Sequence, residues 1–305
     1  MESWNNFQIH LRNSDNLKNT IAGAGAGCVT SILTCPLDVV KTRLQNQGHR
    51  ITEPKLGHKN YKGTAGTLTR IWAEEGIRGL YRGLGPTIYG YLPTWAIYFS
   101  VYDHLKIVVA NKSNRSQDNV LVHIASAMGA GAASSILTNP LWVIKTRFMT
   151  QSERTAYHYR NTFDAFATIW KHEGLRGFYK GLTPSLLGIV HVAVQFPLYE
   201  KLKISLRPEN GEPLGTTSIL IASSASKMAA SIVTYPHEVI RTRLQNQTVP
   251  PYKYLGVTHA ISTINREEGW TAFYKGMPTN LFRTVPASAL TILTYELIIK
   301  KLNQL

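Results

Sequence analysis

A ten-residue motif that occurs three times constrains the fold of this chain more than any other feature of its sequence. The copies begin at Pro36, Pro140 and Pro236, so their starts lie 104 and 96 residues apart. Each copy contains two aliphatic residues followed by Lys or Arg, then Thr and Arg. The 305 residues therefore divide into three similar units. These units are longer than the repeats of about 20–50 residues that are typical of solenoids.

A second signature repeats with the same period and runs from Glu-Gly to Tyr-Arg-Gly or Tyr-Lys-Gly. Its copies cover residues 75–83, 173–181 and 268–276. An amphipathic stretch precedes each copy, for example residues 162–170, and is too short to span a bilayer, so we expect it to lie along the interface. Each unit therefore has room for two membrane-spanning helices with a short helix between them.

Uncharged runs mark the membrane spans, although the mean hydropathy of −0.12 is typical of a soluble protein. Residues 20–37, 83–102, 119–144 and 181–199 contain no Asp, Glu, Lys or Arg, and a span needs about 20 predominantly apolar residues. The Ser, Thr, Gly and Tyr residues in these runs suit a bundle around a wet interior. We predict an all-α membrane protein with six transmembrane helices. Its N-terminal tail would cover residues 1–19, and its three repeats would cover residues 20–111, 119–206 and 216–305.

The formal net charge of +15 favours an anionic partner. A basic helical adaptor or nucleic-acid-binding protein is one alternative, and it would dissolve without detergent and bind nucleic acid in a salt-dependent way. The Lys and Arg residues, however, lie at the ends of the uncharged runs and in loops, and they form no single basic stripe. We therefore expect contact with an anionic membrane surface and an anionic cargo, and not with nucleic acid.

The sequence contains no recognisable catalytic constellation. It has no paired catalytic carboxylates at suitable spacing and no glycine-rich phosphate loop after a strand. His237-Glu238 lacks the second histidine of a zinc-binding helix. We therefore expect a protein that is not an enzyme and that holds no metal or cofactor.

The two signatures, in three registered copies over nearly the whole chain, resemble the pattern of the mitochondrial carrier family. This resemblance implies six tilted helices with pseudo-threefold symmetry, a short amphipathic matrix helix in each repeat, and a monomer in the mitochondrial inner membrane. One central site would open alternately to the cytosol and to the matrix. The resemblance also implies cardiolipin at the Tyr-Arg/Lys-Gly helix starts, where free backbone amides bind phosphate well.

The same resemblance implies a matrix gate, in which the acid of each ten-residue motif pairs with the base of the next. The pairs carried over to this chain are Asp38–Lys145 and Glu238–Lys41. The third acid position holds Trp142, which leaves Arg241 without a carboxylate. An arginine over an indole face recovers about 0.5–2 kcal/mol as a cation–π contact, and we favour this interpretation over a packing or lipid-facing tryptophan. Gln45 and Gln245 match the glutamine that braces such gates.

A cytoplasmic gate at the opposite ends of the helices is also implied by the resemblance. Its residues in this chain are Asp103, Lys106, Glu200, Lys203 and Glu296. The third repeat has Ile299 where a base is expected. We therefore predict that this gate is the weaker of the two.

Two lone bases interrupt the spans of the third repeat. Lys227 lies nine residues before Pro236 and Arg283 lies eight residues after Lys275, so both lie about 12–14 Å from the same end of their helices. An unpaired base inside a membrane costs about 2.5–3.5 kcal/mol on insertion and is a functional candidate. The alternative is that both bases neutralise an internal carboxylate, but no Asp or Glu occurs at comparable depth.

Arg283 also matches one of three substrate contact points that the resemblance implies. The other two points are Gly90 and Gly188, and Ile189 adjoins the second. The paired cations suit phosphate, and glycines leave room for a flat ring. Trp95 offers that ring a stacking face, with a core position as the alternative.

The sequences around Trp95 and Trp142 are similar to those of carriers for NAD, FAD, folate and pyrimidine nucleotides. The stretch from His191 to Glu200 looks most like the NAD carriers. A nucleotide-type anion is therefore the expected substrate, with NAD favoured. A pyrimidine nucleotide, FAD or folate is the alternative.

Overall fold

The structure is a computed structural model that describes residues 15–48, 61–114, 116–117, 119–151, 157–207 and 215–304. Within these ranges the chain is helical and contains no β-strand. The elements are α2 (Asp15–Asn46), α3 (Gly63–Leu80), α4 (Leu84–Ser113), α5 (Val120–Thr150), α6 (Thr162–Phe178), α7 (Leu182–Leu187), α8 (Val190–Ser205), α9 (Thr216–Gln245), α10 (Val257–Glu268), the 3-10 helix η2 (Trp270–Tyr274) and α11 (Met277–Asn303). Helix α2 includes residues 15–19, which we assigned to the tail, and the rest of that tail lies outside the described residues.

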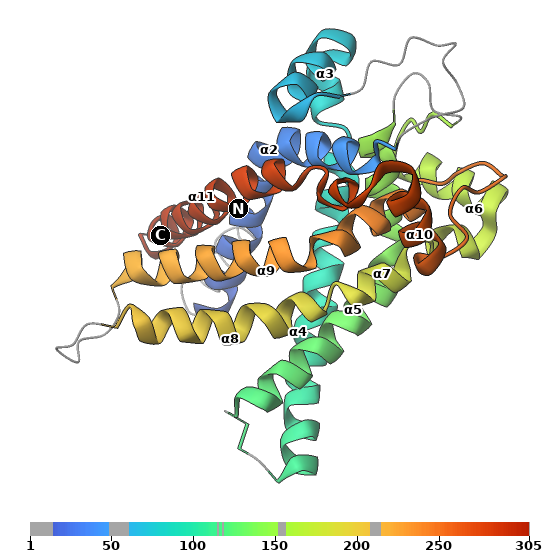
Figure 1. Cartoon of the computed structure of the whole chain (residues 1–305). Helices are drawn as coiled ribbons and strands as arrows, with labels where there is room; N and C mark the ends of the chain where they lie inside the picture. Colours follow the sequence, from blue (N-terminus) through green and yellow to red (C-terminus); the bar gives the residue numbers. More distant parts are fainter. Residues whose placement is uncertain are drawn as a thin grey trace.

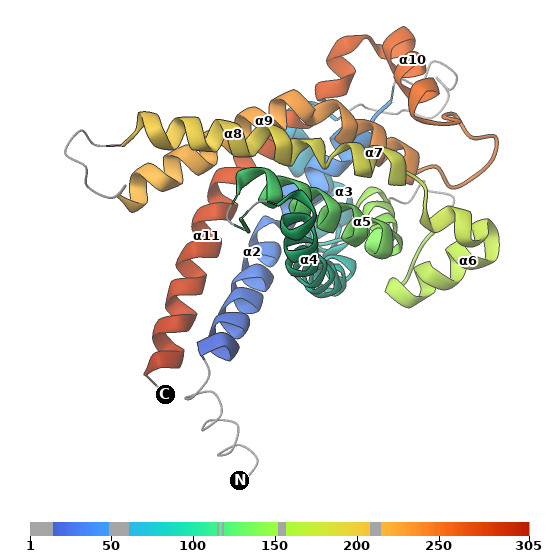
Figure 2. The ribbon, with the colours of Figure 1, turned by 90° about the horizontal axis from the view of Figure 1, so that it is seen from below.

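Three helix pairs form the frame of the molecule. Helix α4 packs against α5, α8 against α9, and α11 against α2. Each pair joins the last long helix of one repeat to the first of the next, and the pair of α11 and α2 closes the ring. Lys18 donates a hydrogen bond to Asn303 across this last pair, at 3.2 Å. The pairs converge where α2, α5 and α9 end and diverge toward their other ends (Figure 1, Figure 2).

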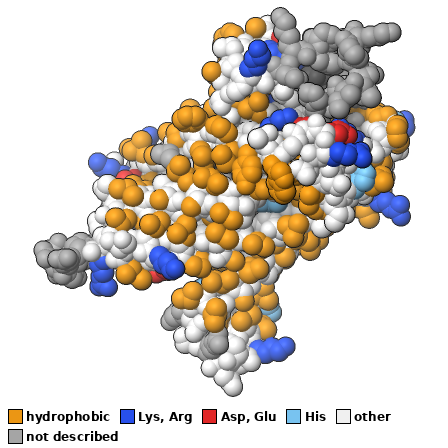
Figure 3. All heavy atoms as spheres, in the orientation of Figure 1, with side chains coloured by type: hydrophobic (Ala, Val, Ile, Leu, Met, Phe, Trp, Pro, Cys, Tyr) orange, Lys and Arg blue, Asp and Glu red, His pale blue; other side chains and the backbone are white. Residues whose placement is uncertain are grey.

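Helices that could cross a membrane are present in all three repeats. By length and apolarity they are Ala22–Asn46, Val120–Thr150, Leu182–Ser205 and Trp270–Asn303. Helices α4 and α9 have 30 residues each but do not reach the same apolarity, because α4 carries four tyrosines and α9 is rich in Ser and Thr. Hydrophobic side chains cover much of the outer face of the frame (Figure 3).

The second long helix of the middle repeat is broken, which the uncharged run at residues 181–199 did not predict. It consists of α7 and α8, separated by a tight junction at Gly188 and Ile189. A bond from His191 N to Gly188 O, at 3.0 Å, tightens this junction. A Cβ on Gly188 would lie 2.6 Å from Nε2 of His237, so the junction brings the broken helix close against α9.

An arginine in each ten-residue motif binds the glutamate of the second signature in the same repeat. These bidentate pairs are Arg43–Glu75, Arg147–Glu173 and Arg243–Glu268. The basic residues of Tyr-Arg/Lys-Gly bind the same carboxylates, at 2.9 Å for Arg82, 2.5 Å for Lys180 and 2.6 Å for Lys275. The motif arginines also donate to the next repeat, as from Arg243 to the carbonyl of Gln45 at 3.1 Å. Both signatures therefore build one threefold ring that joins the repeats.

Glycines turn the chain at both ends of the second signature. Gly174 of Glu-Gly has a φ of +61° and Gly181 of Tyr-Lys-Gly a φ of +75°, and the equivalent glycines of the other repeats are also left-handed. Glycine adopts this conformation without steric cost. The turns let the glutamate and the following base reach the same arginine, which explains why both glycines recur in the signature.

The ring also changes the acidity of its carboxylates. Burial alone would raise the pKa of Glu268, but hydrogen bonds from Arg243 and Lys275 outweigh burial and lower this pKa from 4.5 to about 2. The same balance, with Arg147 and Lys180 as donors, lowers the pKa of Glu173. Both carboxylates therefore stay ionised at neutral pH, as their salt bridges require.

The buried apolar core lies beside this ring and is divided among the repeats. In the first repeat, Val40 and Leu44 of α2 pack with Ile71 and Leu80 of α3. Equivalent clusters join α5 to α6 and α9 to α10. The three short helices are therefore fixed to the ends of α2, α5 and α9, next to the site described below.

Candidate functional site

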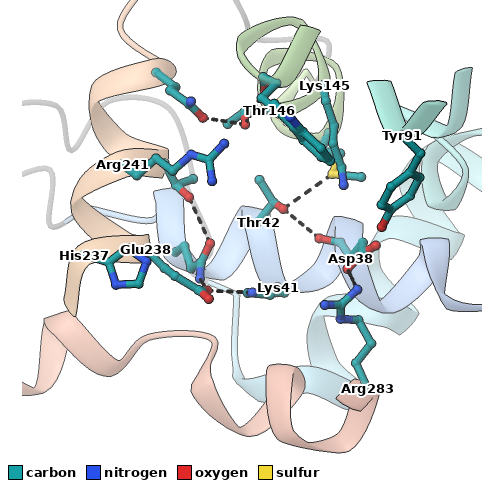
Figure 4. A pocket seen from close by; sticks show the side chains of 15 residues that line it. Asp38, Lys41, Thr42, Tyr91, Lys145, Thr146, His237, Glu238, Arg241 and Arg283 are labelled. Carbon is teal, nitrogen blue, oxygen red and sulfur yellow. Dashed lines mark hydrogen bonds and ion pairs between the residues drawn. The ribbon is translucent and has the colours of Figure 1, made fainter. Parts of the chain in front are cut away.

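A central cavity of about 270 Å³ lies where α2, α5 and α9 meet α4 and α11. Its charged lining residues are Asp38, Lys41, Lys145, Glu238, Arg241 and Arg283. The ten-residue motif supplies all of them except Arg283. Because its acid and base positions lie three residues apart on one helical face, both can point inward together. Figure 4 shows these side chains entering the cavity from several helices.

Lys41 and Glu238 form an ion pair between the first and third repeats, with 2.6 Å between Nζ and Oε2. Lys41 also donates to Asn280 at 2.9 Å. Gln45 braces the acid, since its Nε2 donates to Glu238 at 3.1 Å and its Oε1 accepts from Thr242 at 2.9 Å. This contact is one of the two pairs predicted for the matrix gate.

The other predicted pair, Asp38–Lys145, is absent from this structure. Asp38 instead binds Arg283, with 2.8 Å between Oδ1 and Nη1. Helices α2 and α11 pack side by side, so the guanidinium reaches the aspartate directly (Figure 4). Lys145 lies over the rings of Trp142 and Tyr91, with Nζ 4.7 Å and 5.9 Å from their centroids. The prediction for Asp38 is therefore wrong in this conformation.

Trp142 holds the ammonium of Lys145, and this corrects the predicted contact with Arg241. Lys145 lies three residues after Trp142 on the same helical face, so it reaches the indole without crossing the cavity. The indole is fixed because its Nε1 donates to Thr138 at 3.1 Å and the Tyr91 ring meets it edge-on, with 5.8 Å between centroids. Nε of Arg241 is buried and has no hydrogen-bond partner in the described part of the chain. A buried donor left unpaired costs about 1–3 kcal/mol.

Positive charge is in excess around the central cavity. Its lining contains four bases and two acids, which leaves a surplus of two positive charges. Lys41 and Arg283 have carboxylate partners, whereas Lys145 and Arg241 form no salt bridge with any described residue. A concave site with this imbalance attracts anions.

Comparison with known proteins places this arrangement in a family. The family model described as mitochondrial carrier protein matches residues 12–113, 116–210 and 212–304. The chain belongs to the mitochondrial carrier family. Its six long helical segments, namely α2, α4, α5, the α7–α8 segment, α9 and α11, are therefore transmembrane helices in three repeats. The family does not support the alternative of a soluble adaptor or nucleic-acid-binding protein.

Several relatives of this carrier have names that state a substrate. Nicotinamide adenine dinucleotide transporter 1, chloroplastic, of Arabidopsis thaliana is 46% identical over 95% of this chain and 93% of its own length. Mitochondrial nicotinamide adenine dinucleotide transporter 1 of Saccharomyces cerevisiae is 44% identical over 90% of this chain and 74% of its own length. Folate transporter 1, chloroplastic, of Arabidopsis thaliana is 37% identical over 94% of this chain and 96% of its own length.

Among the six predicted substrate contacts of the carrier, Arg283 alone lines the central cavity. Lys227 is exposed on α9. Trp95 is 52% exposed on α4, where it stacks on Phe99 with 5.6 Å between ring centroids. Its neighbour Thr94 lines a second cavity of about 230 Å³, so Trp95 stands beside an opening and not in the buried core.

The three small or aliphatic positions of the prediction lie in helix contacts. A Cβ on Gly90 would lie 3.8 Å from Leu141. Ile189 lies close to Gly131 of α5. At Gly188 the space that we assigned to a flat ring is occupied by His237, which corrects that part of the prediction.

Sequence reasoning missed Tyr91, Asn280 and His237 as residues of the site. Tyr91 directly follows Gly90, one of the three predicted contact points, so its place near the cargo could have been predicted from the sequence. His237 stands where the first two motifs have leucine, and this polar exception was the available signal. Asn280 has no sequence signal, because its contact with Lys41 depends on how α11 packs on α2.

Among the described residues, the opposite end of the carrier has no compact ring like that around the motifs. Asp103, Glu200 and Glu296 are exposed there. Lys203 pairs with Glu200 of its own helix, at 3.9 Å. The helix pairs diverge at this end (Figure 2). The conformation therefore has an ion pair between repeats at one end of the cavity and diverging helix pairs at the other.

Proposed function

We propose that this carrier moves NAD across the mitochondrial inner membrane without changing it chemically, by opening one central site alternately to each side. The surplus of positive charge around the central cavity carries the proposal, because a dinucleotide brings a dianionic diphosphate. The names and the 44–46% identity of its NAD-transporting relatives support the choice of cargo. Two of these relatives are named mitochondrial, which supports the compartment.

Arg283 is the first proposed cargo ligand, and its position suggests how cargo affects the helices. Its guanidinium can bind phosphate bidentately, but in this structure it holds Asp38 at 2.8 Å. A phosphate that binds Arg283 therefore competes with Asp38 and loosens the contact between α11 and α2. Cargo shifts the equilibrium only as far as it binds the occluded state better than either open state, and gradients set the direction.

The remaining predicted contacts complete the proposed site. Lys227 would be a second cation, and Trp95 would stack on a base. Gly90, Gly188 and Ile189 would set the spacing of the helices around the cargo. The matrix gate would consist of the Lys41–Glu238 pair with Gln45, together with Lys145, Arg241 and Gln245 of the second and third repeats. The cytoplasmic gate would be formed by the charged residues Asp103, Lys106, Glu200, Lys203 and Glu296.

Lipid contact and oligomeric state are part of the same proposal. Helices α4 and α11 begin after left-handed glycines and have no side-chain cap. Leu84 N already donates to Tyr81 O, and Pro86 and Pro278 have no N–H, so the amides that we propose for a cardiolipin phosphate are those of Gly85 in α4 and Thr279 in α11. The threefold ring closes within one chain, since Arg243 of the third repeat bonds to Gln45 of the first. A monomer is therefore sufficient to form the site.

Uptake into liposomes tests this proposal. The purified carrier is reconstituted, and internal label is measured after addition of labelled NAD, FAD, folate or a pyrimidine nucleotide, with protein-free liposomes as the control. We expect saturable uptake of NAD above that of the other three. Uptake of folate or a pyrimidine nucleotide without NAD would identify a different cargo, and no uptake of any of them would refute the proposal.

A further inference from the structure

We infer that Lys145, Arg241 and Trp142 form a phosphate subsite on the side of the central cavity lined by α5 and α9, which we call its floor. The diphosphate of the cargo would bind there. This inference rests on the proposed nucleotide transport and adds the place where the anion is held. It concerns residues that the family pattern assigns to a gate and not to cargo.

Two bases of the cavity have no acid to bind. Lys145 lies over the indole of Trp142 and Nε of Arg241 is buried without a partner, although both side chains line the cavity. They extend into it from α5 and α9, on opposite sides (Figure 4). A guanidinium can bind phosphate bidentately and an ammonium can bind it as a point charge. Neither base has a carboxylate partner among the described residues, so both can contribute to an anion site.

The charge balance of the cavity leads to the same conclusion. Trp142 occupies the position that carries Asp38 in the first motif and Glu238 in the third, so the lining lacks one carboxylate. Two positive charges remain uncompensated, and like charges in a partly buried site repel each other. A dianionic diphosphate diester supplies the missing negative charge. In this arrangement the cargo takes the place of the third acid.

The size of the cavities determines which part of the cargo fits at the floor. The central cavity of about 270 Å³ is slightly smaller than typical ligand pockets, which measure about 300–1,000 Å³. It therefore accommodates a diphosphate group more easily than a whole dinucleotide. The second cavity shares Trp142 and Arg241 with the first and is lined by Thr94 and Thr138. A phosphate bound between Lys145 and Arg241 would thus leave space for a ring beside Thr94.

Thermal unfolding of the detergent-purified carrier with inorganic pyrophosphate tests the subsite. Trp142→Glu restores the carboxylate, and Trp142→Gln is the matched variant without charge. We expect the concentration of pyrophosphate that gives half of the stabilisation to be at least tenfold higher for Trp142→Glu than for Trp142→Gln. Trp72→Glu places the same carboxylate on the exposed face of α3 and should leave the wild-type value unchanged. Equal values for the two Trp142 variants would overturn the inference.

Arg241→Gln provides a second test if Trp142→Glu does not fold. Because this change removes an unpartnered charge, we expect the ligand-free protein to be at least as stable as the wild type, with affinity for pyrophosphate reduced at least tenfold. Unchanged affinity would contradict the subsite. NAD uptake by the wild type separates the two proposals. If the wild type takes up NAD but the variants bind pyrophosphate with unchanged affinity, only the subsite is refuted. If the variants lose affinity for pyrophosphate as expected but the wild type takes up no NAD, only the proposed cargo is refuted.

Discussion

Arg283 of α11 holds Asp38 of α2 with 2.8 Å between their charged atoms, so the base proposed to bind cargo is also the partner of the first motif's acid. Lys145, the partner predicted for that acid, lies instead over Trp142. Cargo that takes Arg283 would leave Asp38 without its base, and a diphosphate bound to Lys145 would keep that lysine from replacing it. The arrangement therefore links cargo binding to the loss of the ion pair between α11 and α2.

Replacing Arg283 tests this link directly. Arg283→Ala should reduce NAD uptake at least 100-fold, because the charge that binds phosphate is lost. Asp38 can then pair with Lys145, so we expect the melting temperature to change little. Arg283→Lys keeps the charge but not the bidentate geometry and should retain more uptake than the alanine variant. Full uptake by Arg283→Ala would exclude this residue from the cargo site.

Lys227 is expected to contribute to transport and not to stability. It is exposed on α9, so Lys227→Ala should reduce NAD uptake at least tenfold without lowering the melting temperature. Lys300→Ala removes an exposed lysine from the end of α11 and is the control. Equal uptake by the two variants would show that Lys227 lies outside the site.

The Lys41–Glu238 pair should stabilise the carrier. Its side chains are 14% and 28% exposed, and removing one partner of a buried pair costs about 3–5 kcal/mol. Lys41→Gln should therefore lower the melting temperature. The double variant Lys41→Glu/Glu238→Lys, which exchanges the two charges, should recover part of this loss. Lys253→Ala breaks the more exposed pair with Glu267 and should have a much smaller effect. If the double variant melts at no higher temperature than Lys41→Gln, the ion pair does not stabilise the carrier.

Acid should destabilise the threefold ring through Glu268. Its folded pKa of about 2 lies below the unfolded value of 4.5, so its contribution is fully present above pH 4.5 and is lost as the pH falls toward 2. The melting temperature should therefore decline as the pH is lowered from 5 to about 2.5. Glu268→Gln should be less stable than the wild type at pH 7 and should show a flatter decline. Parallel curves would show that this carboxylate does not account for the acid sensitivity.

Gly181 should tolerate alanine poorly. Its φ of +75° and ψ of +11° lie in the left-handed region, which costs about 1–2 kcal/mol for a residue with a Cβ. The new Cβ would also lie 2.7 Å from Cγ of Gln245 and 3.1 Å from the carbonyl oxygen of Arg241. Gly181→Ala should therefore lower the melting temperature, whereas Gly215→Ala, at a φ of −62° with nothing within 4 Å of the new Cβ, should leave it near the wild-type value. Equal melting temperatures for the two variants would mean that α9 can move away from this turn.

Much of the fold of this protein can be predicted from the regular spacing of its two repeated sequence motifs. The three motifs and their resemblance to the mitochondrial carriers predicted the six helices, and the family match confirms them. The acid and base positions of each motif lie on one helical face because of the period of the helix, whereas the pairing of Lys41 with Glu238 was implied by the resemblance to the carriers. Arg283 was identified because an isolated charge within an apolar segment is costly.

Only the tertiary structure decided which charges meet. Asp38 binds Arg283 and not Lys145 because α11 packs beside α2, and a sequence pattern does not report the lateral distance between two helices. With Asp38 held by Arg283, Lys145 lies over the indole of Trp142, which is three residues earlier on the same helix, and Arg241 has no acid partner among the described residues. A salt bridge requires atoms within a few ångströms of each other, so its partners depend on helix packing. The sequence alone determined the repeats and the inward-facing charged positions, and packing chose the pairs among them.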